Sequence, residues 1–185
     1  MNNKSKDDLF VISAPSAGGK TTIIKGLLQS FEGSLHKVIT CTTRHKRKDE
    51  VDGVDYKFIS EEKFFELKEK KAFIEHSLVY GKHYGVLKND LYMSGKRIIC
   101  LDSKGVNNFK KLQIKAVYIF IVPPSLEVLK ERLLDRGSES SESINIRLKE
   151  AKEEMDQTKL FDYVVVNDKL EDAIDMCRKI ITGEI

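Results

Sequence analysis

The 185-residue chain has no tryptophan, only three prolines and three cysteines, and no marked excess of charge of either sign. It has 32 Lys and Arg residues against 29 Asp and Glu, and this net charge of +3 predicts no dedicated nucleic-acid surface. No apolar run approaches the roughly 20 residues that span a bilayer, so we expect no membrane insertion. The polar first eight residues do not resemble a signal peptide, which favours a cytoplasmic protein.

The three cysteines, Cys41, Cys100 and Cys177, are far apart in the sequence. They form no CxxC pair and no disulfide framework, so we expect free thiols in a reducing compartment. Hydrophobic residues make up 41% of the chain and charged residues 33%, which is typical of a folded domain. The length predicts one domain, with room for a small insertion. No pattern in the sequence fixes an oligomeric state.

Strand-like and helix-like segments alternate along the chain, which is the α/β pattern. We expect strands over residues 9–13, 38–42, 56–59, 72–79, 97–101, 116–122 and 163–166. We expect helices over residues 20–31, 61–70, 125–136, 144–155 and 169–182. The stretch 36–92 differs from the rest, because it is rich in charge, Tyr, His and Gly and its expected strands are short. It predicts a functional insertion in a parallel-sheet core that residues 1–35 and 93–185 form.

A glycine-rich stretch between the first expected strand and helix matches the phosphate-loop pattern GxxxxGK[ST], with Ala14 in place of the first Gly. Gly18 and Gly19 let successive N–H groups turn inward, and the helix N-terminus adds partial positive charge. Lys20 should reach the β- and γ-phosphates, and the Thr21 hydroxyl should coordinate Mg²⁺. The ATP-binding residues predicted from this loop are Ala14, Pro15, Ser16, Ala17, Gly18, Gly19, Lys20, Thr21 and Thr22.

Four further motifs follow the loop: TCTTRHKR at 40–47, EVDGVDY at 50–56, FIE at 73–75 and GKHYG at 81–85. With these motifs the chain resembles the guanylate kinases, a family of P-loop nucleoside monophosphate kinases, over nearly its whole length. The resemblance implies direct in-line phosphoryl transfer from ATP to GMP, and to dGMP, with Mg²⁺ as cofactor. It implies a three-layer α/β/α P-loop fold with a central parallel sheet. A small mixed α+β GMP-binding insertion at 36–92 and a helical lid at about 136–148 complete it.

The chemistry of the acceptor agrees with the resemblance. A phosphate monoester favours guanidinium forks and phenolic hydroxyls, which two arginines and two tyrosines of these motifs supply. Guanine presents two adjacent donors on one edge, and the resemblance places Glu75 where a carboxylate accepts both. Adenine lacks this donor pair, so a buried Glu75 should reject AMP. The predicted GMP-binding residues are Thr40, Arg44, Arg47, Tyr56, Glu75, Tyr84 and Asp102.

The segment 123–148 resembles the family's lid region and carries three arginines. Phosphoryl transfer needs positive charge around the moving group. The predicted catalytic residues are therefore Lys20, Arg44, Arg132, Arg136 and Arg147. The resemblance adds Asn167 to the ATP-binding residues, beside the adenine, and it gives Asp102 either the guanine amino group or the water shell of Mg²⁺.

Two positions depart from the family pattern. Val86 stands where the family usually has a hydroxyl facing guanine, which should weaken GMP binding by about 1 kcal/mol, so Val86→Ser should lower KM. Cys100 stands where the family usually has the first of two acids. Two alternatives therefore stay open: a kinase of the same fold with another small phosphorylated acceptor, and a non-catalytic guanylate-kinase-like binding domain. Lys20, Thr21 and the arginines favour a GMP kinase.

Overall fold

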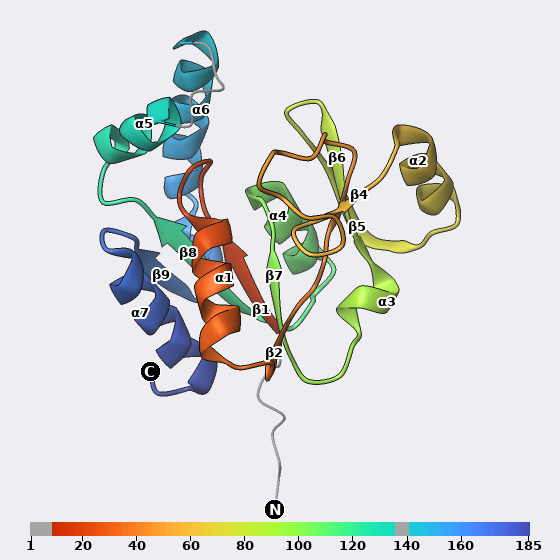
Figure 1. Ribbon diagram of the computed structural model, residues 1–185, viewed down its shortest axis with the longest axis horizontal. Coiled ribbons are helices and arrows are strands. Elements are labelled where there is room, and N and C mark those ends of the chain that lie inside the picture. Colours follow the sequence, from red (N-terminus) through yellow and green to blue (C-terminus); the bar gives the residue numbers. More distant parts are fainter. Residues whose placement is uncertain (1–8, 136–140) are drawn as a thin grey trace, which may run out of the picture.

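The structure, a computed structural model, describes residues 9–135, the backbone from residue 141 and the side chains from residue 144. Its described strands form two sheets (Figure 1). One holds five parallel strands in the order β2-β7-β1-β8-β9, and the other is mixed, in the order β4-β3-β6-β5. The predicted fold class, a central parallel sheet with helices plus a smaller mixed α+β part, is confirmed.

The central strands of the parallel sheet are buried on both faces because helices cover each face. Its strands are β1 (Leu9–Ser13), β2 (Leu35–Lys37), β7 (Lys96–Cys100), β8 (Val117–Val122) and β9 (Tyr163–Val166). The helices of this part are α1 (Lys20–Ser30), α4 (Ser103–Lys111), α5 (Leu126–Asp135), α6 (Ser141–Met155) and α7 (Leu170–Thr182). In the central strand β1, Phe10 and Ile12 pack with α1 and α7, whereas Leu9 and Val11 pack with α4. This burial on both faces explains why the strand is a continuous apolar run.

The mixed sheet lies beside the parallel sheet (Figure 1). Its elements are β3 (Cys41–Thr42), β4 (Lys57–Phe58), α2 (Glu61–Glu69), β5 (Phe73–Val79), β6 (Lys82–Leu87) and α3 (Lys88–Leu91). Ser60 caps α2 by accepting a hydrogen bond from the backbone of Lys63 at 3.2 Å. Phe64 of this helix is fully buried, and its ring stacks on Phe73 with centroids 4.6 Å apart. The mixed sheet therefore has its own small apolar core.

The strand expected over 38–42 is wrong as a single element. The chain instead passes from one sheet to the other: the N–H of Val38 donates to Ile98 of β7, whereas the carbonyl of Thr40 accepts from Lys57 of β4. Strand β2 therefore ends at Lys37 and a separate strand begins at Cys41. Periodicity cannot reveal this, because the apolar run is continuous across the crossing.

Several elements were not expected from the sequence, among them β2, α3, β6 and α4. Strand β6 forms the antiparallel partner of β5, and helix α4 follows β7. Helix α4 has only Val106 and Phe109 as large buried residues, so its apolar face is short. Asp102 begins this helix by accepting a hydrogen bond from the N–H of Gly105 at 2.8 Å. A short 3₁₀ turn, Thr158–Leu160, precedes β9.

The parallel sheet brings distant segments to one edge. The phosphate loop follows β1, Asp102 follows β7 and Asn167 follows β9. Because all these strands are parallel, their carboxyl ends meet at the same edge, where open α/β sheets bind their ligands. Over the described part of the chain, no helix is both long and apolar enough to cross a membrane.

Val86 lies in the core rather than in an exposed position. Its side chain is fully buried and packs in the cluster that contains Leu9, Val38 and Leu101. We therefore expect Val86→Ser to lower the free energy of unfolding by about 2 kcal/mol, because it removes apolar burial and adds a buried hydroxyl. Urea unfolding would measure this, with Val51→Ser, at a position 54% exposed, as the control. Equal effects of the two substitutions would contradict the packing described.

Candidate active site

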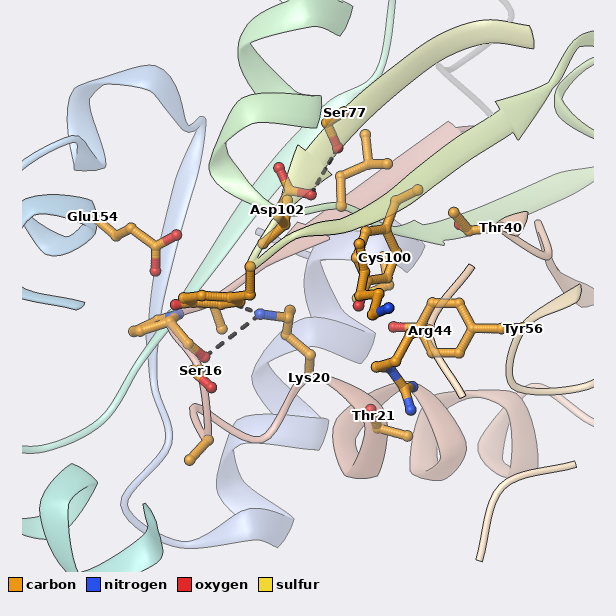
Figure 2. Close-up of a pocket in the computed structure, with 18 of the residues that line it drawn as sticks. Ser16, Lys20, Thr21, Thr40, Arg44, Tyr56, Ser77, Cys100, Asp102 and Glu154 are labelled. Carbon is orange, nitrogen blue, oxygen red and sulfur yellow. Dashed lines mark hydrogen bonds between the residues drawn. The ribbon is translucent and has the colours of Figure 1, made fainter. Parts of the chain in front are cut away.

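A cavity of about 360 Å³ opens at the carboxyl edge of the parallel sheet, facing the mixed sheet (Figure 2). The phosphate loop and α1 supply one side of it, and strands β5 and β6 with the loop before β4 supply the other. Its lining residues are Ala14, Pro15, Ser16, Ala17, Gly19, Lys20, Thr21, Thr22, Thr40, Arg44, Arg47, Tyr56, Glu75, Ser77, Val79, Tyr80, Lys82, Tyr84, Cys100, Leu101, Asp102, Arg147 and Glu154.

The phosphate loop is held in place from within and from β9. The N–H of Gly18 donates to Pro15 at 2.9 Å, and the side-chain amide of Asn167 donates to the carbonyl of Gly18 at 3.0 Å. Gly19 has φ +97°, and a Cβ there would lie 2.3 Å from the Asn167 amide nitrogen, so only glycine fits. The Lys20 ammonium donates to the carbonyls of Ala14 and Pro15 and so lies across the loop (Figure 2).

One arginine from a distant segment contacts this loop, and a second contacts Asn167, which supports it. The Arg147 guanidinium on α6 donates to the Ser16 hydroxyl at 2.7 Å. The Arg132 guanidinium on α5 donates to the backbone carbonyl of Asn167 at 3.0 Å. Arg136, the third predicted arginine, lies outside the described residues. Arg147 therefore adds positive charge directly at the loop, whereas Arg132 adds it at Asn167, which holds the loop.

The opposite side of the cavity carries the predicted acceptor arginine. Arg44 forms a bidentate ion pair with Glu50, with distances of 2.9 and 2.6 Å, and its guanidinium lies 5.4 Å from the ring centroid of Tyr56. Tyr56 in turn packs edge-on against Tyr84, with centroids 6.0 Å apart. Burial would raise the pKa of Glu50, but the hydrogen bonds and charge of Arg44 outweigh it and hold that pKa below its ordinary value. The pair fixes the guanidinium beside two phenol rings.

A pair of carboxylates, Glu75 and Asp102, lies deeper in the cavity. Glu75 is only 5% exposed, and the amide of Asn108 approaches it at 3.4 Å. Burial, and next the charge of Asp102, raise the pKa of Glu75 to about 7. Asp102 accepts from the Ser77 hydroxyl at 3.1 Å through one oxygen and caps α4 through the other (Figure 2). Each carboxylate oxygen has two lone pairs, so both groups keep acceptor capacity toward the cavity.

The cavity brings together most of the residues predicted from the sequence. Every residue of the predicted GMP-binding set lines it. Eight of the nine predicted phosphate-loop residues, all except Gly18, line it as well. The catalytic candidates Lys20, Arg44 and Arg147 line it as well. Among the described candidates, Gly18, Arg132 and Asn167 do not line it. Gly18 belongs to the phosphate loop, the buried Asn167 donates to its carbonyl, and Arg132 donates to the backbone of Asn167.

Sequence reasoning missed several lining residues. Glu154 of α6 accepts from the Ser103 hydroxyl at 3.0 Å; burial raises its pKa, and the charge of Lys20 opposes that shift. Its spacing of seven residues from Arg147 places both side chains on one helix face, and this signal was available in the sequence. Ser77 and Tyr80 gave no such signal, because only the pairing of β5 with β6 and the packing against α4 and α6 bring them to the cavity.

The arrangement suits a ligand with phosphates and a polar base. Five cationic side chains line the cavity, namely Lys20, Arg44, Arg47, Lys82 and Arg147. Three carboxylates, Glu75, Asp102 and Glu154, line it as well. The buried Glu75 favours a hydrogen-bond donor rather than a phosphate beside it. The two oxyanion-binding surfaces, the phosphate loop and the arginine–tyrosine group, face one space and so can bring two phosphate groups together.

Burial of Glu75 should destabilise the ligand-free fold at high pH. Its raised pKa means that the native state binds more protons than the unfolded chain between about pH 4.5 and 7, so stability falls as the pH rises through that window. We expect Glu75→Gln to raise the free energy of unfolding at pH 8 by up to about 3 kcal/mol and to leave it nearly unchanged at pH 5. Chemical denaturation at both pH values measures this, with the exposed Glu69→Gln as the control. An equal gain at both pH values would contradict the assignment.

Comparisons with known proteins agree with this geometry. The family model described as "Guanylate kinase" matches residues 6–184. The chain is 40% identical to a guanylate kinase of Clostridium perfringens (strain 13 / Type A) in an alignment that covers 100% of this chain and 88% of that protein. It is 41% identical to a guanylate kinase of Thermotoga maritima, covering 97% and 88% respectively.

Solved structures give the same result. The crystal structure of guanylate kinase from Anaplasma phagocytophilum matches with a TM-score of 0.78 and 31% identity, covering 95% of this chain and 85% of that chain. A shikimate kinase from Acinetobacter baumannii matches with a TM-score of 0.55 and 12% identity, which shows a shared fold alone. Because the family model and relatives of nearly full length agree with one another and with the site, this chain belongs to the guanylate kinase family.

Proposed function

We propose that this enzyme transfers the γ-phosphoryl group of ATP to the phosphate of GMP, giving ADP and GDP. The observation that carries the proposal is a cavity with a phosphate loop on one side and, on the other, an arginine–tyrosine group with the buried Glu75 beside Asp102. Segment 36–92, which contains the mixed sheet, supplies most of the acceptor site, with Asp102 added from the core, and residues 1–35 and 93–185 bind the donor. The family's printed activity, guanylate kinase, supports the same reaction.

On the donor side, the backbone N–H groups of the phosphate loop and the N-terminus of α1 bind the phosphates of ATP. Lys20 stabilises the charge on the β- and γ-phosphates, and its attachment to the loop carbonyls of Ala14 and Pro15 keeps the ammonium close to them. Asn167 supports this site by holding the loop through Gly18, and the adenine contact expected for it stays a prediction.

On the acceptor side, Arg44 and Arg47 bind the GMP phosphate, with the hydroxyls of Tyr56 and Tyr84 as further donors. The ion pair with Glu50 orients the Arg44 guanidinium and leaves donor capacity, since a guanidinium has five N–H groups. No covalent intermediate is required, because the acceptor phosphate oxygen attacks the γ-phosphorus directly. Positioning of the two phosphates and neutralisation of their charge supply the catalysis.

The carboxylates of Glu75 and Asp102 recognise the guanine base. Guanine donates from N1–H and from its 2-amino group, and Glu75 accepts both, while Asp102 serves the amino group or a metal-bound water. Asn108 and Ser77 orient the two carboxylates through the hydrogen bonds described above. Adenine would leave the buried Glu75 without a donor, which disfavours AMP strongly. We include dGMP as an acceptor because the family resemblance implies it.

The residues fit Mg²⁺. The Thr21 hydroxyl and the carboxylates of Asp102 and Glu154 line the same cavity as Lys20, and all offer hard oxygen atoms. Mg²⁺ in kinase sites keeps several waters and takes few protein ligands besides the phosphates, which agrees with the absence of a cluster of three acidic, His or Cys side chains among the described residues. Thr21 would bind the ion directly and Asp102 through water. Bound Mg²⁺ would neutralise charge on the transferring phosphates.

Arg147 places a further positive charge beside the loop, where charge develops on the transferring group. Arg132 supports the same region through Asn167, and we assign Arg136 to it by the family resemblance. These groups favour a kinase over a non-catalytic binding domain. A cytoplasmic location stays a prediction from the sequence.

Substrate selectivity tests the function directly. Purified protein with Mg²⁺ and ATP is mixed separately with GMP, dGMP, AMP, CMP and UMP, and ADP formation is followed. We expect ADP only with GMP and dGMP, because only guanine satisfies Glu75. ADP formation with another monophosphate instead of GMP would show that the acceptor is not GMP. No ADP formation with any of the five would contradict the assignment as a nucleoside monophosphate kinase.

Lys20→Ala tests the donor side. We expect kcat to fall by about a hundredfold or more, because the variant loses the ammonium at the transferring phosphates. Circular dichroism should show an intact fold. Lys111→Ala, an exposed lysine at the end of α4, is the matched control and should leave kcat unchanged. Activity of Lys20→Ala within tenfold of the wild type would contradict the role given to Lys20.

The pH dependence of KM tests Glu75. As the pH falls below about 7, protonation removes the acceptor, so KM for GMP should rise by up to about tenfold per pH unit. The phosphate of GMP titrates near pH 6 as well, so Glu75→Gln is measured beside the wild type. The variant should have a high KM throughout and lack the steeper dependence. Parallel pH profiles for the two proteins would show that Glu75 does not contact the base.

A further inference from the structure

Tyr80 occupies the turn that joins β5 to β6, in a backbone conformation that rarely suits an aromatic residue. Val79 pairs with Lys82, so Tyr80 and Gly81 form the turn, and their φ angles are +49° and +70°. Positive φ at both positions defines a type I′ turn, which favours Asn or Gly at the first of them. A tyrosine there is strained, and strain of this kind persists where the side chain makes contacts that matter.

The Tyr80 side chain contacts helix α6. Its hydroxyl donates a hydrogen bond to the carboxylate of Glu150, and the guanidinium of Arg147 lies 4.9 Å from its ring centroid. These two partners are three residues apart and so share one helix face. Partial burial and the hydrogen bond to Glu150 raise the pKa of Tyr80, so the hydroxyl stays a donor. Tyr80 thereby connects the mixed sheet to α6.

Arg147 continues this connection to the phosphate loop. The same guanidinium that lies against Tyr80 donates to the Ser16 hydroxyl at 2.7 Å. The hairpin itself is tied to α4, because Lys104 donates to the carbonyl of Leu78 at 3.0 Å. Residues from the acceptor side and the donor side of the cavity therefore meet at one arginine.

We propose that Tyr80 is a positioning residue that holds Arg147 over the phosphate loop and thereby couples the acceptor side of the cavity to the donor side. The proposal rests on the function given above, in which Arg147 binds phosphate. In this coupling, bound GMP orders the β5–β6 hairpin and so fixes the position of Tyr80. Tyr80 in turn fixes the Arg147 guanidinium, which binds the phosphates of ATP. By linkage, ATP then strengthens GMP binding by the same factor.

The experiment measures that factor in the full chain. Calorimetry gives Kd for GMP with and without a saturating non-hydrolysable ATP analogue and Mg²⁺. For the wild type we expect Kd to fall at least about fivefold when the analogue is present. In Tyr80→Asn this ratio should fall to within about twofold of one. A wild-type ratio of one, or a variant that keeps the wild-type ratio, overturns the proposal.

Asparagine is chosen because it separates positioning from stability. It suits the positive φ of the turn better than tyrosine does, so the melting temperature of Tyr80→Asn should equal or exceed that of the wild type. If the melting temperature and the ratio both fall, Tyr80 is structural and the proposal is wrong. Tyr92→Asn, at a position 65% exposed beside α3, is the matched control and should keep the wild-type ratio.

Two further variants identify which contact carries the effect. Tyr80→Phe keeps the ring against Arg147 and removes the hydroxyl, so it should retain a ratio within about 1.5-fold of the wild type. Tyr80→Asn and Arg147→Met should be non-additive in the ratio, because they interrupt one connection. Additive effects, or a Phe variant as impaired as the Asn variant, overturn the assignment to the ring contact. Failure of the wild type to bind either nucleotide would instead refute the proposed function.

Discussion

The constraint on which the structure depends is the close approach of the Asn167 side chain to the backbone of the phosphate loop. Residue 19 must be glycine because its φ is positive and a Cβ there would collide with the Asn167 amide, which is buried and donates to the carbonyl of Gly18. The loop thus requires β1 and β9 in one parallel sheet, with β8 between them. Every other functional group is placed relative to this edge: Asp102 by the neighbouring β7, and Arg147 by a helix that reaches back to Ser16.

The site places two carboxylates close together, although their repulsion and burial oppose folding. Glu75 is buried next to Asp102, an arrangement that raises its pKa and opposes folding at neutral pH. Asn108 makes only a long contact of 3.4 Å, so the Glu75 carboxylate can still accept further hydrogen bonds. This acceptor capacity is the source of selectivity, because a base with the correct donor pair satisfies it and another base does not. Arg44 differs from Glu75, because its charge is already paired: Glu50 accepts two hydrogen bonds from the guanidinium and so fixes its orientation.

The parallel sheet and the phosphate loop could be predicted from the sequence, because each has a local pattern with a physical cause, whereas the acceptor residues were predicted from the resemblance to the guanylate kinases. Strand β9 and α1 follow directly from apolar periodicity, and Lys20 follows from its motif. Residues that depend on tertiary pairing were less accessible. The crossing between β2 and β3 lies inside one apolar run, and α4 has too short an apolar face for periodicity to detect. Val86 has the sequence position of a base-side residue, yet its side chain packs in the core.

Tyr80 shows how a local violation can indicate function. Turn chemistry favours Asn at its position, so sequence rules applied locally would replace it. The structure explains the tyrosine by contacts that a shorter side chain could not make, since only a long aromatic residue reaches both Arg147 and Glu150 on α6. The conformational cost is local to the hairpin, whereas the benefit appears across the cavity, at the phosphate loop. Residues of this kind are found only when backbone angles and long-range contacts are considered together.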